Sequence, residues 1–325
     1  MDRLQILDTL RKTNPWLTTG KVKKTQLEPF KRREYFEIRQ NLCDFNMAEL
    51  VVGARRVGKS VLMYQLIQDL LDTGIDPKRI LFVQGDNPIL REIPTERTIL
   101  SEILEIYQNY ILSEKFDSLT GNTYIFIDEA HSLENWQLEV KTLIDLKPKI
   151  KFFITGSSSS ELRRGSQSPL VGRVKIKILP PFSFLDYFRF FYTKTNNNWS
   201  DFLFDNSRQF KQAFIQNDLD TIIKCAKKLT NFCKRNNLQP KTCFDRYLTT
   251  GSFPYVLTIK NPEERSRYLG DLLSMTVSRD IITKAKIRDP QAFERLIVNI
   301  CLNVSSRISY KTLGDKIGID ERSII

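Results

Sequence analysis

The sequence predicts an α/β protein built around a five-stranded parallel sheet. Two observations carry this prediction: short apolar runs bounded by polar or turn residues recur through residues 48–180, and helical stretches separate them. The expected strands are 50–52, 80–84, 123–127, 152–155 and 174–179. The expected crossover helices are 59–73, which Gly74 ends, 99–112, and 133–146, which ends before Pro148. From Pro180 onward the pattern becomes helical, so the sheet is confined to the earlier region.

The composition indicates an ordinary globular chain. At 325 residues, with 41% hydrophobic and 27% charged residues, it is typical of a soluble protein with two structural units. No apolar run approaches the roughly 18 residues that span a bilayer, and the start of the chain does not resemble a signal peptide. A cytoplasmic location without a membrane partner is therefore expected. Five cysteines without a Cys-x-x-Cys pair, and a single histidine, favour reduced thiols over a zinc site.

The net charge of +12 is uneven along the chain. Residues 1–47 carry ten basic against six acidic residues, residues 48–180 carry seventeen of each, and residues 181–325 carry twenty-three against fifteen. This pattern suggests that the basic flanks, rather than the middle, meet an acidic partner such as nucleic acid. Solvated surface charge is the alternative for basic runs such as Lys31, Arg32 and Arg33.

Residues 53–60 match the pattern Gly-x-x-x-x-Gly-Lys-[Ser/Thr] between an expected strand and an expected helix. In this P-loop context the backbone N–H groups and the helix N-terminus point at phosphate oxygens. Lys59 is then expected to reach the β- and γ-phosphates, and the Ser60 hydroxyl to ligate Mg²⁺. A glycine turn without a ligand is the alternative. The expected ATP-binding residues are Gly53, Ala54, Arg55, Arg56, Val57, Gly58, Lys59, Ser60 and Val61.

The expected strand 123–127 runs into two carboxylates, Asp128 and Glu129. Asp128 is expected to hold Mg²⁺ through water, and Glu129 to polarise the water that attacks the γ-phosphate. Carboxylates at a strand end also cap helices, so this assignment depends on the P-loop upstream. His131 completes a motif similar to the DEAH box of helicases, but no second set of parallel strands follows Pro180. His131 is therefore expected to orient the carboxylates or to begin the next helix.

Two further residues are candidates for acting on the γ-phosphate. Ser157 follows the expected strand 152–155, where a hydroxyl can sense that phosphate; Thr155 is the second choice, and a cap for the next helix is the alternative. Arg173 directly precedes the fifth expected strand and is a candidate arginine finger, from its own chain or from a neighbouring subunit. An ordinary surface arginine is the alternative for Arg173.

Four parts are expected along the chain. Residues 1–47 form a basic helical segment, 48–180 the P-loop ATPase core with strand order 5-1-4-3-2, 181–290 a helical lid or insertion, and 291–325 the start of a winged-helix-like module. In that last part Leu313 and Ile317 share a helix face, Gly318 turns the chain and Asp320 can cap a second helix, as in a helix-turn-helix. The module is expected to be incomplete.

These motifs together resemble the bacterial and archaeal AAA-type ATPases that carry a C-terminal domain of unknown function. The resemblance rests on Gly-x-Arg-Arg-Val-Gly-Lys-Ser, Ile-Asp-Glu-Ala-His, Thr-Gly-Ser-Ser and the runs at 170–173 and 179–184, and it covers about residues 15–325. It implies an AAA-like three-layer core, a helical lid, a winged-helix-like module and a nuclease-like domain that these 325 residues do not contain. The family's Gly-Gly-Phe-Pro-Glu is replaced by Gly-Ser-Phe-Pro-Tyr at 251–255, so no catalytic role is expected there.

The expected function is that of an AAA-type molecular switch or motor that binds ATP with Mg²⁺ and hydrolyses it. Its target is nucleic acid or a protein partner, and a homo-oligomer is a candidate assembly. The alternative is a regulatory NTPase that binds nucleotide tightly, hydrolyses it slowly and signals to a protein partner. Stimulation of turnover by DNA distinguishes the two, because a motor responds to its track.

Overall fold

The computed structural model describes residues 3–44, 47–91, 98–157, 169–192, 197–282, 287, 289–304 and 306–320. The chain separates into two compact units, Met1–Thr258 and Ile259–Ile325. We describe each unit by itself. Among the described residues, no helix combines the length and the apolar character needed to cross a lipid bilayer.

The first unit contains the predicted sheet. Its strands are β1 (Ala48–Gly53), β2 (Ile80–Gln84), β3 (Thr123–Asp128), β4 (Ile150–Ser157) and β5 (Val174–Ile178). The order β2-β3-β4-β1-β5 confirms the predicted order, read from the opposite edge, and every pair is parallel. Gly53 lies opposite Ser157, and Gln84 lies opposite Asp128. The carboxyl ends of β1, β3 and β4 therefore meet at one edge of the sheet.

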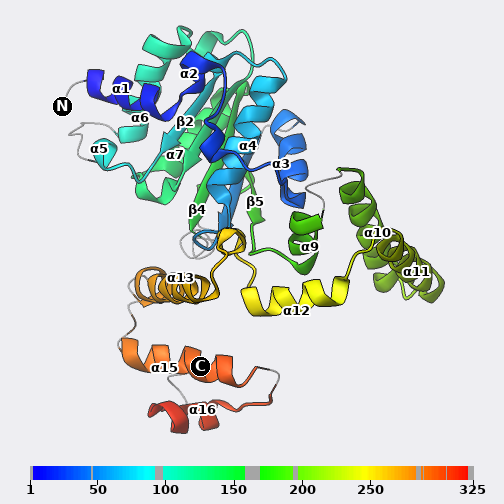
Figure 1. Ribbon diagram of the computed structural model, residues 1–325. Helices are drawn as coiled ribbons and strands as arrows, with labels where there is room; N and C mark the ends of the chain where they lie inside the picture. The colour runs from blue at the N-terminus through cyan, green and yellow to red at the C-terminus, as the bar shows by residue number, and fades with distance from the viewer. Residues whose placement is uncertain are drawn as a thin grey trace. The chain divides into compact units, whose positions relative to one another are not determined.

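Helices cover both faces of the sheet (Figure 1), because alternate residues of its strands point to opposite sides and both sides are apolar. Ile125 and Ile127 join one apolar cluster, whereas Tyr124 and Phe126 join the other. The first face is covered by α1 (Arg3–Thr13), α6 (Ile99–Tyr107) and α7 (Trp136–Leu146), and the second by α3 (Arg33–Asp44) and α4 (Lys59–Asp72). A π-helical turn, η3 (Gln108–Leu112), extends α6. Short helices are α2 (Trp16–Thr19), η1 (Lys24–Gln26), η2 (Pro77–Arg79), α5 (Pro88–Arg91), η4 (Phe116–Ser118) and η5 (Ala130–Ser132).

The N-terminal segment is part of this core. Leu10 and Trp16 are buried. The Asn14 side chain pairs with the edge strand β2: its Nδ2 donates to the Phe82 carbonyl at 2.9 Å, and its Oδ1 accepts from the Phe82 N–H at 2.6 Å. The Trp16 indole N–H donates to the Ile80 carbonyl at 3.0 Å. These contacts satisfy backbone groups that an open edge strand would expose.

Helices follow β5 within the same unit: α9 (Phe184–Tyr192), α10 (Asn197–Ile215), α11 (Leu219–Arg235), α12 (Pro240–Thr250) and the turn η7 (Pro254–Thr258). Tyr187 and Cys243 belong to an apolar cluster that these helices share. The polar stretch 205–235 belongs to two helices, α10 and α11, rather than to one. Asn217 turns the chain with a φ of 55°, and Asp218 accepts from the Thr221 N–H at 3.0 Å to begin α11.

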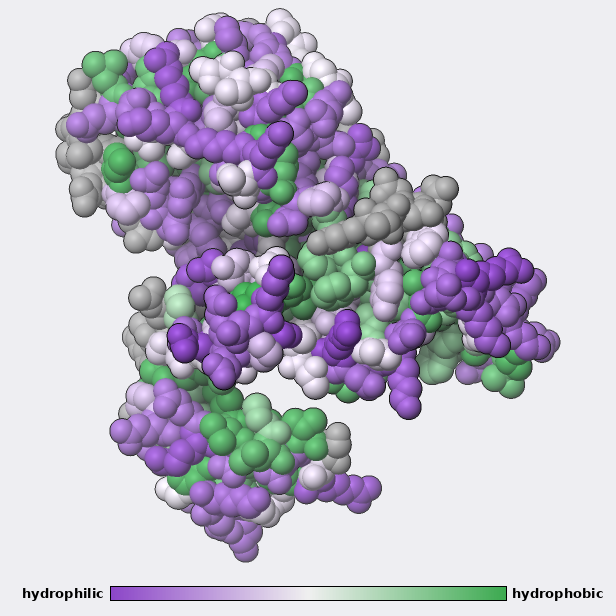
Figure 2. All heavy atoms as spheres, in the orientation of Figure 1, coloured by the Kyte–Doolittle hydropathy of each residue, from purple (hydrophilic) through white to green (hydrophobic). Residues whose placement is uncertain are grey.

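The second unit is helical, with α13 (Pro262–Met275), η8 (Thr276–Ile282), α15 (Pro290–Leu302) and α16 (Tyr310–Ile317). Ser309 caps α16 by accepting from the Thr312 N–H at 3.1 Å, and Gly318 ends it with a φ of 77°. These are the first helix and the turn of the predicted helix-turn-helix; the second helix falls at 321–325, outside the described residues. Apolar side chains gather over α15, where Val298 and Leu302 are exposed (Figure 2).

Candidate nucleotide-binding site

The turn between β1 and α4 presents the N-terminus of a helix. Gly58 has a φ of 100°, a conformation that favours glycine, and as the N-cap residue it offers no side chain to the first turn of α4. The backbone N–H groups of that turn are thus available to an anion, whose charge the helix dipole favours. Arg56, at the tip of the loop, is exposed and has a φ of 65°.

Lys59 is folded back over its own loop. Its side chain is buried, and Nζ donates to the carbonyl oxygens of Gly53 at 3.1 Å and Ala54 at 3.2 Å. The same nitrogen lies 3.8 Å from a carboxylate oxygen of Glu129. The structure therefore brings the predicted P-loop lysine and the predicted catalytic glutamate into one group.

Asp128 is held by hydroxyl groups on two sides. The Ser60 Oγ donates to its Oδ2 at 2.7 Å, and the Thr155 Oγ1 donates to its Oδ1. Thr155 is completely buried, and its Oγ1 also accepts from the Glu129 backbone N–H at 3.0 Å. One hydroxyl on β4 thus orients both members of the acidic pair that follows β3.

Glu129 occupies a constrained position. Its φ of 50° lies in the left-handed region, which is uncommon for a residue with a side chain. Burial raises the pKa of its carboxyl group, and the charge of Asp128 adds to this effect, while Lys59 opposes it. His131, in η5, lies beside it, with Nδ1 3.3 Å from the Glu129 Oε2.

Gly85, which the sequence analysis did not select, supports this turn. Its N–H donates to the Asp128 carbonyl at 2.8 Å. A Cβ at this position would lie 2.8 Å from the Glu129 carbonyl oxygen and 3.0 Å from that of Asp128. The close approach of two backbones therefore requires glycine. The signal in the sequence is a glycine directly after the expected strand 80–84.

The two other candidates, Ser157 and Arg173, lie at opposite ends of the sheet. The Ser157 backbone pairs with Gly53 beside the P-loop, and its side chain lies outside the described residues. Arg173 precedes β5, and its carbonyl oxygen accepts from the Ala48 N–H at 2.9 Å, at the amino end of the sheet. The length of β1, roughly 16 Å, separates that end from the P-loop. Arg173 instead pairs with Asp145 through a 2.6 Å hydrogen bond, which lowers the pKa of that carboxyl group.

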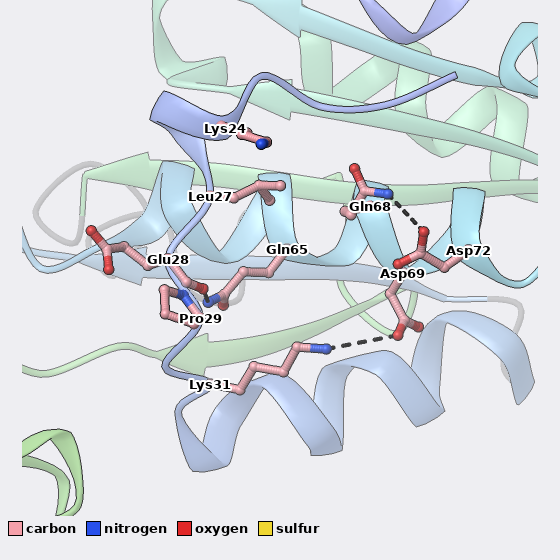
Figure 3. Close-up of a pocket in the computed structure, with 9 residues that line it drawn as sticks. All are labelled: Lys24, Leu27, Glu28, Pro29, Lys31, Gln65, Gln68, Asp69 and Asp72. Atoms are coloured by element: carbon pink, nitrogen blue, oxygen red, sulfur yellow. Dashed lines mark hydrogen bonds and ion pairs between the residues drawn. The ribbon is translucent and has the colours of Figure 1, made fainter. Parts of the chain in front are cut away.

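A cavity of about 390 Å³ lies along α4, away from its N-terminus (Figure 3). Its lining residues are Lys24, Leu27, Glu28, Pro29, Lys31, Gln65, Gln68, Asp69 and Asp72. Gln65 Nε2 donates to the carbonyl oxygens of Glu28 at 2.6 Å and Phe30 at 2.9 Å. These hydrogen bonds hold the N-terminal segment 28–30 against α4, the helix that follows the P-loop.

The fold and the arrangement of the residues around the P-loop define an α/β P-loop core of the AAA-like class, followed by helices. Comparison with known families agrees: residues 46–188 match the family model of an AAA domain. Residues 241–325 match that of a domain of unknown function, DUF8612.

Two curated relatives match most of this chain. An uncharacterized protein of Methanocaldococcus jannaschii is 24% identical over 277 residues, which cover 83% of this chain and 50% of that protein. An uncharacterized protein of Haemophilus influenzae is 23% identical over 279 residues, covering 86% of this chain and 57% of that protein. The chain thus spans about half the length of the curated relatives it matches. A solved Walker-type ATPase of Pyrococcus abyssi has a similar fold, with a TM-score of 0.50 and 15% identity, covering 94% of this chain and 89% of the other.

Proposed function

We propose that the protein binds ATP with Mg²⁺ at residues 53–61 and hydrolyses it, as an AAA-type molecular switch or motor. One observation carries the proposal: hydrogen bonds join Ser60 to Asp128, Asp128 to Thr155, and Thr155 to Glu129. Lys59 lies beside the last of these residues. A phosphate-binding loop, an oxygen site for a cation and a carboxylate base thus meet at the end of one sheet.

The residues present fit ATP and Mg²⁺. Hydroxyl and carboxylate oxygens such as those of Ser60 and Asp128, 2.7 Å apart, are the ligands that Mg²⁺ prefers. They would hold the ion, which supplies neutralisation of charge on the β- and γ-phosphate oxygens. Lys59 Nζ would exchange the carbonyl oxygens of Gly53 and Ala54 for phosphate oxygens, since an ammonium group binds anionic oxygens more strongly than neutral ones.

Glu129 would act as the base toward the attacking water. A carboxylate accepts a proton more readily when burial raises its pKa, as it does for Glu129. The left-handed backbone of Glu129, supported by Gly85 and Thr155, would fix the direction of this carboxylate.

Arg173 enters the proposal as a finger supplied by a neighbouring subunit of a homo-oligomer. Its partly exposed position and its distance from the P-loop of its own chain favour that route over action within one chain. If Arg173 broke its hydrogen bond to Asp145, its guanidinium group would be free to contact a phosphate.

The proposed target is nucleic acid, bound through the basic flanks. Residues 181–325 carry twenty-three basic against fifteen acidic residues, and Lys224, Lys227 and Lys228 on α11 are exposed. The rival proposal is a slowly hydrolysing regulatory NTPase that acts on a protein partner.

Titration calorimetry with ATP and Mg²⁺ tests the nucleotide site. Lys59→Ala is expected to abolish measurable ATP binding, because it removes the cation aimed at the phosphates. Lys211→Ala, which removes an exposed lysine on α10, is the matched control and is expected to bind like the wild type. Equal affinity in Lys59→Ala and the control would refute the P-loop assignment.

A further inference from the structure

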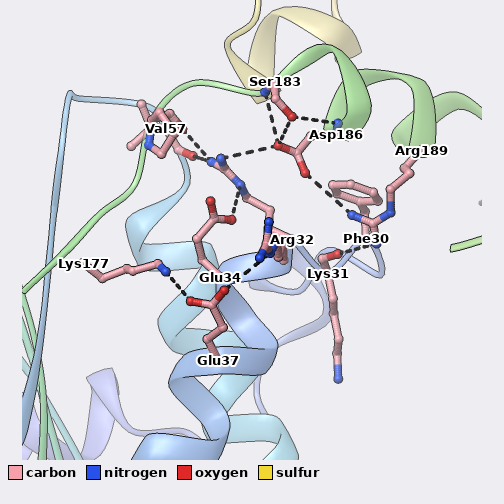
Figure 4. Close-up of polar contacts among 12 residues, drawn as sticks. Phe30, Lys31, Arg32, Glu34, Glu37, Val57, Lys177, Ser183, Asp186 and Arg189 are labelled. Atoms are coloured by element: carbon pink, nitrogen blue, oxygen red, sulfur yellow. Dashed lines mark hydrogen bonds and ion pairs between the residues drawn. The ribbon is translucent and has the colours of Figure 1, made fainter. Parts of the chain in front are cut away.

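Two buried arginines and the carboxylates beside them form a charged network next to the P-loop (Figure 4). Arg32 is 6% exposed and Arg189, on α9, is 2% exposed. Burying a guanidinium group is costly unless it is paired and hydrogen-bonded. The contacts of these two residues therefore indicate what the network holds together.

Arg32 connects three parts of the chain. Its Nη1 donates to the carbonyl oxygen of Val57 at 3.3 Å and to that of Pro180 at 2.8 Å. Val57 is inside the P-loop, directly before Gly58, and Pro180 lies between β5 and α9. One nitrogen of the N-terminal segment thus joins the P-loop backbone to the chain that leads into the helices after the sheet.

Asp186, near the start of α9, links the two arginines. Its Oδ2 lies 3.8 Å from Arg32 Nη2, and its Oδ1 lies 3.6 Å from Arg189 Nη1. Ser183 also donates to Asp186 Oδ2, from its hydroxyl at 2.8 Å and its N–H at 3.2 Å. Glu34 lies 3.4 Å from Arg32 Nε, so two carboxylates balance the two guanidinium groups.

Arg189 fastens the other end of the network to the N-terminal segment. Its Nη2 donates to the Lys31 carbonyl at 3.2 Å, and its guanidinium carbon lies 3.7 Å from the centre of the Phe204 ring and 5.0 Å from that of Phe30. Burial lowers the pKa of Arg189 to about 10, and Asp186 opposes this effect. The segment that carries Arg32 is therefore held by α4 through Gln65 and by α9 through Arg189.

We infer that Arg32 is a positioning residue for the P-loop and that Asp186 couples nucleotide occupancy to α9. This inference rests on the proposed ATP site. When phosphates draw Lys59 away from the carbonyl oxygens of Gly53 and Ala54, the loop loses two internal hydrogen bonds. The Arg32 contact to Val57 does not depend on Lys59, so it can persist when nucleotide is bound. Any shift of Val57 on binding is transmitted through Arg32 to Asp186 and Pro180.

The first test measures ATP affinity by calorimetry and turnover at saturating ATP. Arg32→Lys keeps the charge but has one nitrogen in place of the planar fork, so it cannot make the same set of contacts. We expect about tenfold weaker ATP binding, as for the loss of one charge-assisted hydrogen bond, with a smaller change in kcat than in KM. Arg33→Lys is the control, because Arg33 is exposed and pairs only with Glu37 among the described contacts. Equal affinity in the two folded variants would overturn the positioning role.

The second test measures hydrogen exchange of the α9 amides with and without ATP. The wild type is expected to show ATP-dependent protection of α9. Asp186→Asn keeps the size and an acceptor for Ser183 but removes the charge that links Arg32 to Arg189, so this dependence should disappear while ATP still binds. An Asp186→Asn variant that keeps the wild-type response, or a wild type whose α9 ignores bound ATP, overturns the coupling. A wild type that binds no ATP instead refutes the proposed function itself.

Discussion

Replacing Thr155 by valine removes one hydroxyl and nearly nothing else, because the two side chains have the same shape. The hydroxyl donates to the Asp128 carboxylate and accepts from the Glu129 N–H, and Thr155 is 0% exposed. A hydrogen bond to a charged group contributes about 1.5–3 kcal/mol, and a buried N–H without a partner costs about 1–3 kcal/mol. We therefore expect Thr155→Val to lose roughly 3 kcal/mol of unfolding free energy.

The same substitution should lower turnover more than ATP affinity. Lys59 and the P-loop backbone keep their contacts, whereas Glu129 loses the hydroxyl that orients its backbone. A misplacement of about 1 Å can lower a rate on the order of 100-fold, which is the decrease in kcat that we expect. Urea unfolding and phosphate release measure the two effects.

Thr155→Ser serves as the control, because it keeps the hydroxyl and removes only a methyl group. It should retain near-normal kcat with a stability loss of about 1 kcal/mol. If valine and serine variants hydrolyse ATP at equal rates, the hydroxyl does not orient the catalytic carboxylate and the reasoning is wrong.

The remaining predictions concern acid–base behaviour, the arginine finger and nucleic acid. Burial raises the pKa of Glu49, on β1, from 4.5 to about 7, so its contribution to stability is present at low pH and lost as the pH rises through that value. Urea unfolding of Glu49→Gln and the wild type tests this. The difference in unfolding free energy should shift in favour of Glu49→Gln by at most about 3 kcal/mol between about pH 5 and pH 8. A difference that does not change with pH would contradict the prediction. A mixture of Arg173→Ala and Lys59→Ala should regain part of the lost ATPase activity if the finger acts between subunits. A mixture that regains no activity, together with wild-type activity per subunit that does not depend on protein concentration, would exclude that route. Binding of duplex DNA should weaken with salt at a log–log slope of about −0.9 per phosphate contacted, mainly through residues 181–325, and no binding at about 50 mM salt would favour a protein partner.

Local sequence signals were sufficient for the sheet and the P-loop. Short runs in which every residue is apolar predict strands that are buried on both faces of a parallel sheet. The motif at 53–60 requires a strand before it and a helix after it. The strand order is also confirmed, but it was expected from the resemblance to an AAA-like core and not from local signals.

Contacts between distant segments were not predictable from these patterns. Arg32 looks like one member of a solvated basic run, yet the structure buries it against Val57 and Pro180, which lie 25 and 148 residues away. Arg173 is a candidate because it directly precedes the fifth expected strand, and a residue before a parallel strand lies at the end opposite the P-loop. The role of Thr155 depends on the register that sets β4 beside β3.

Phosphate release from ATP by the wild type and by Glu129→Gln is the measurement that tests the central claim most directly. The amide keeps the size of the side chain and cannot act as a base. The proposed mechanism predicts that Glu129→Gln binds ATP with Mg²⁺ about as tightly as the wild type and hydrolyses it slower by orders of magnitude. Hydrolysis by Glu129→Gln at the wild-type rate, or a wild type that releases no phosphate while it binds ATP, would contradict it.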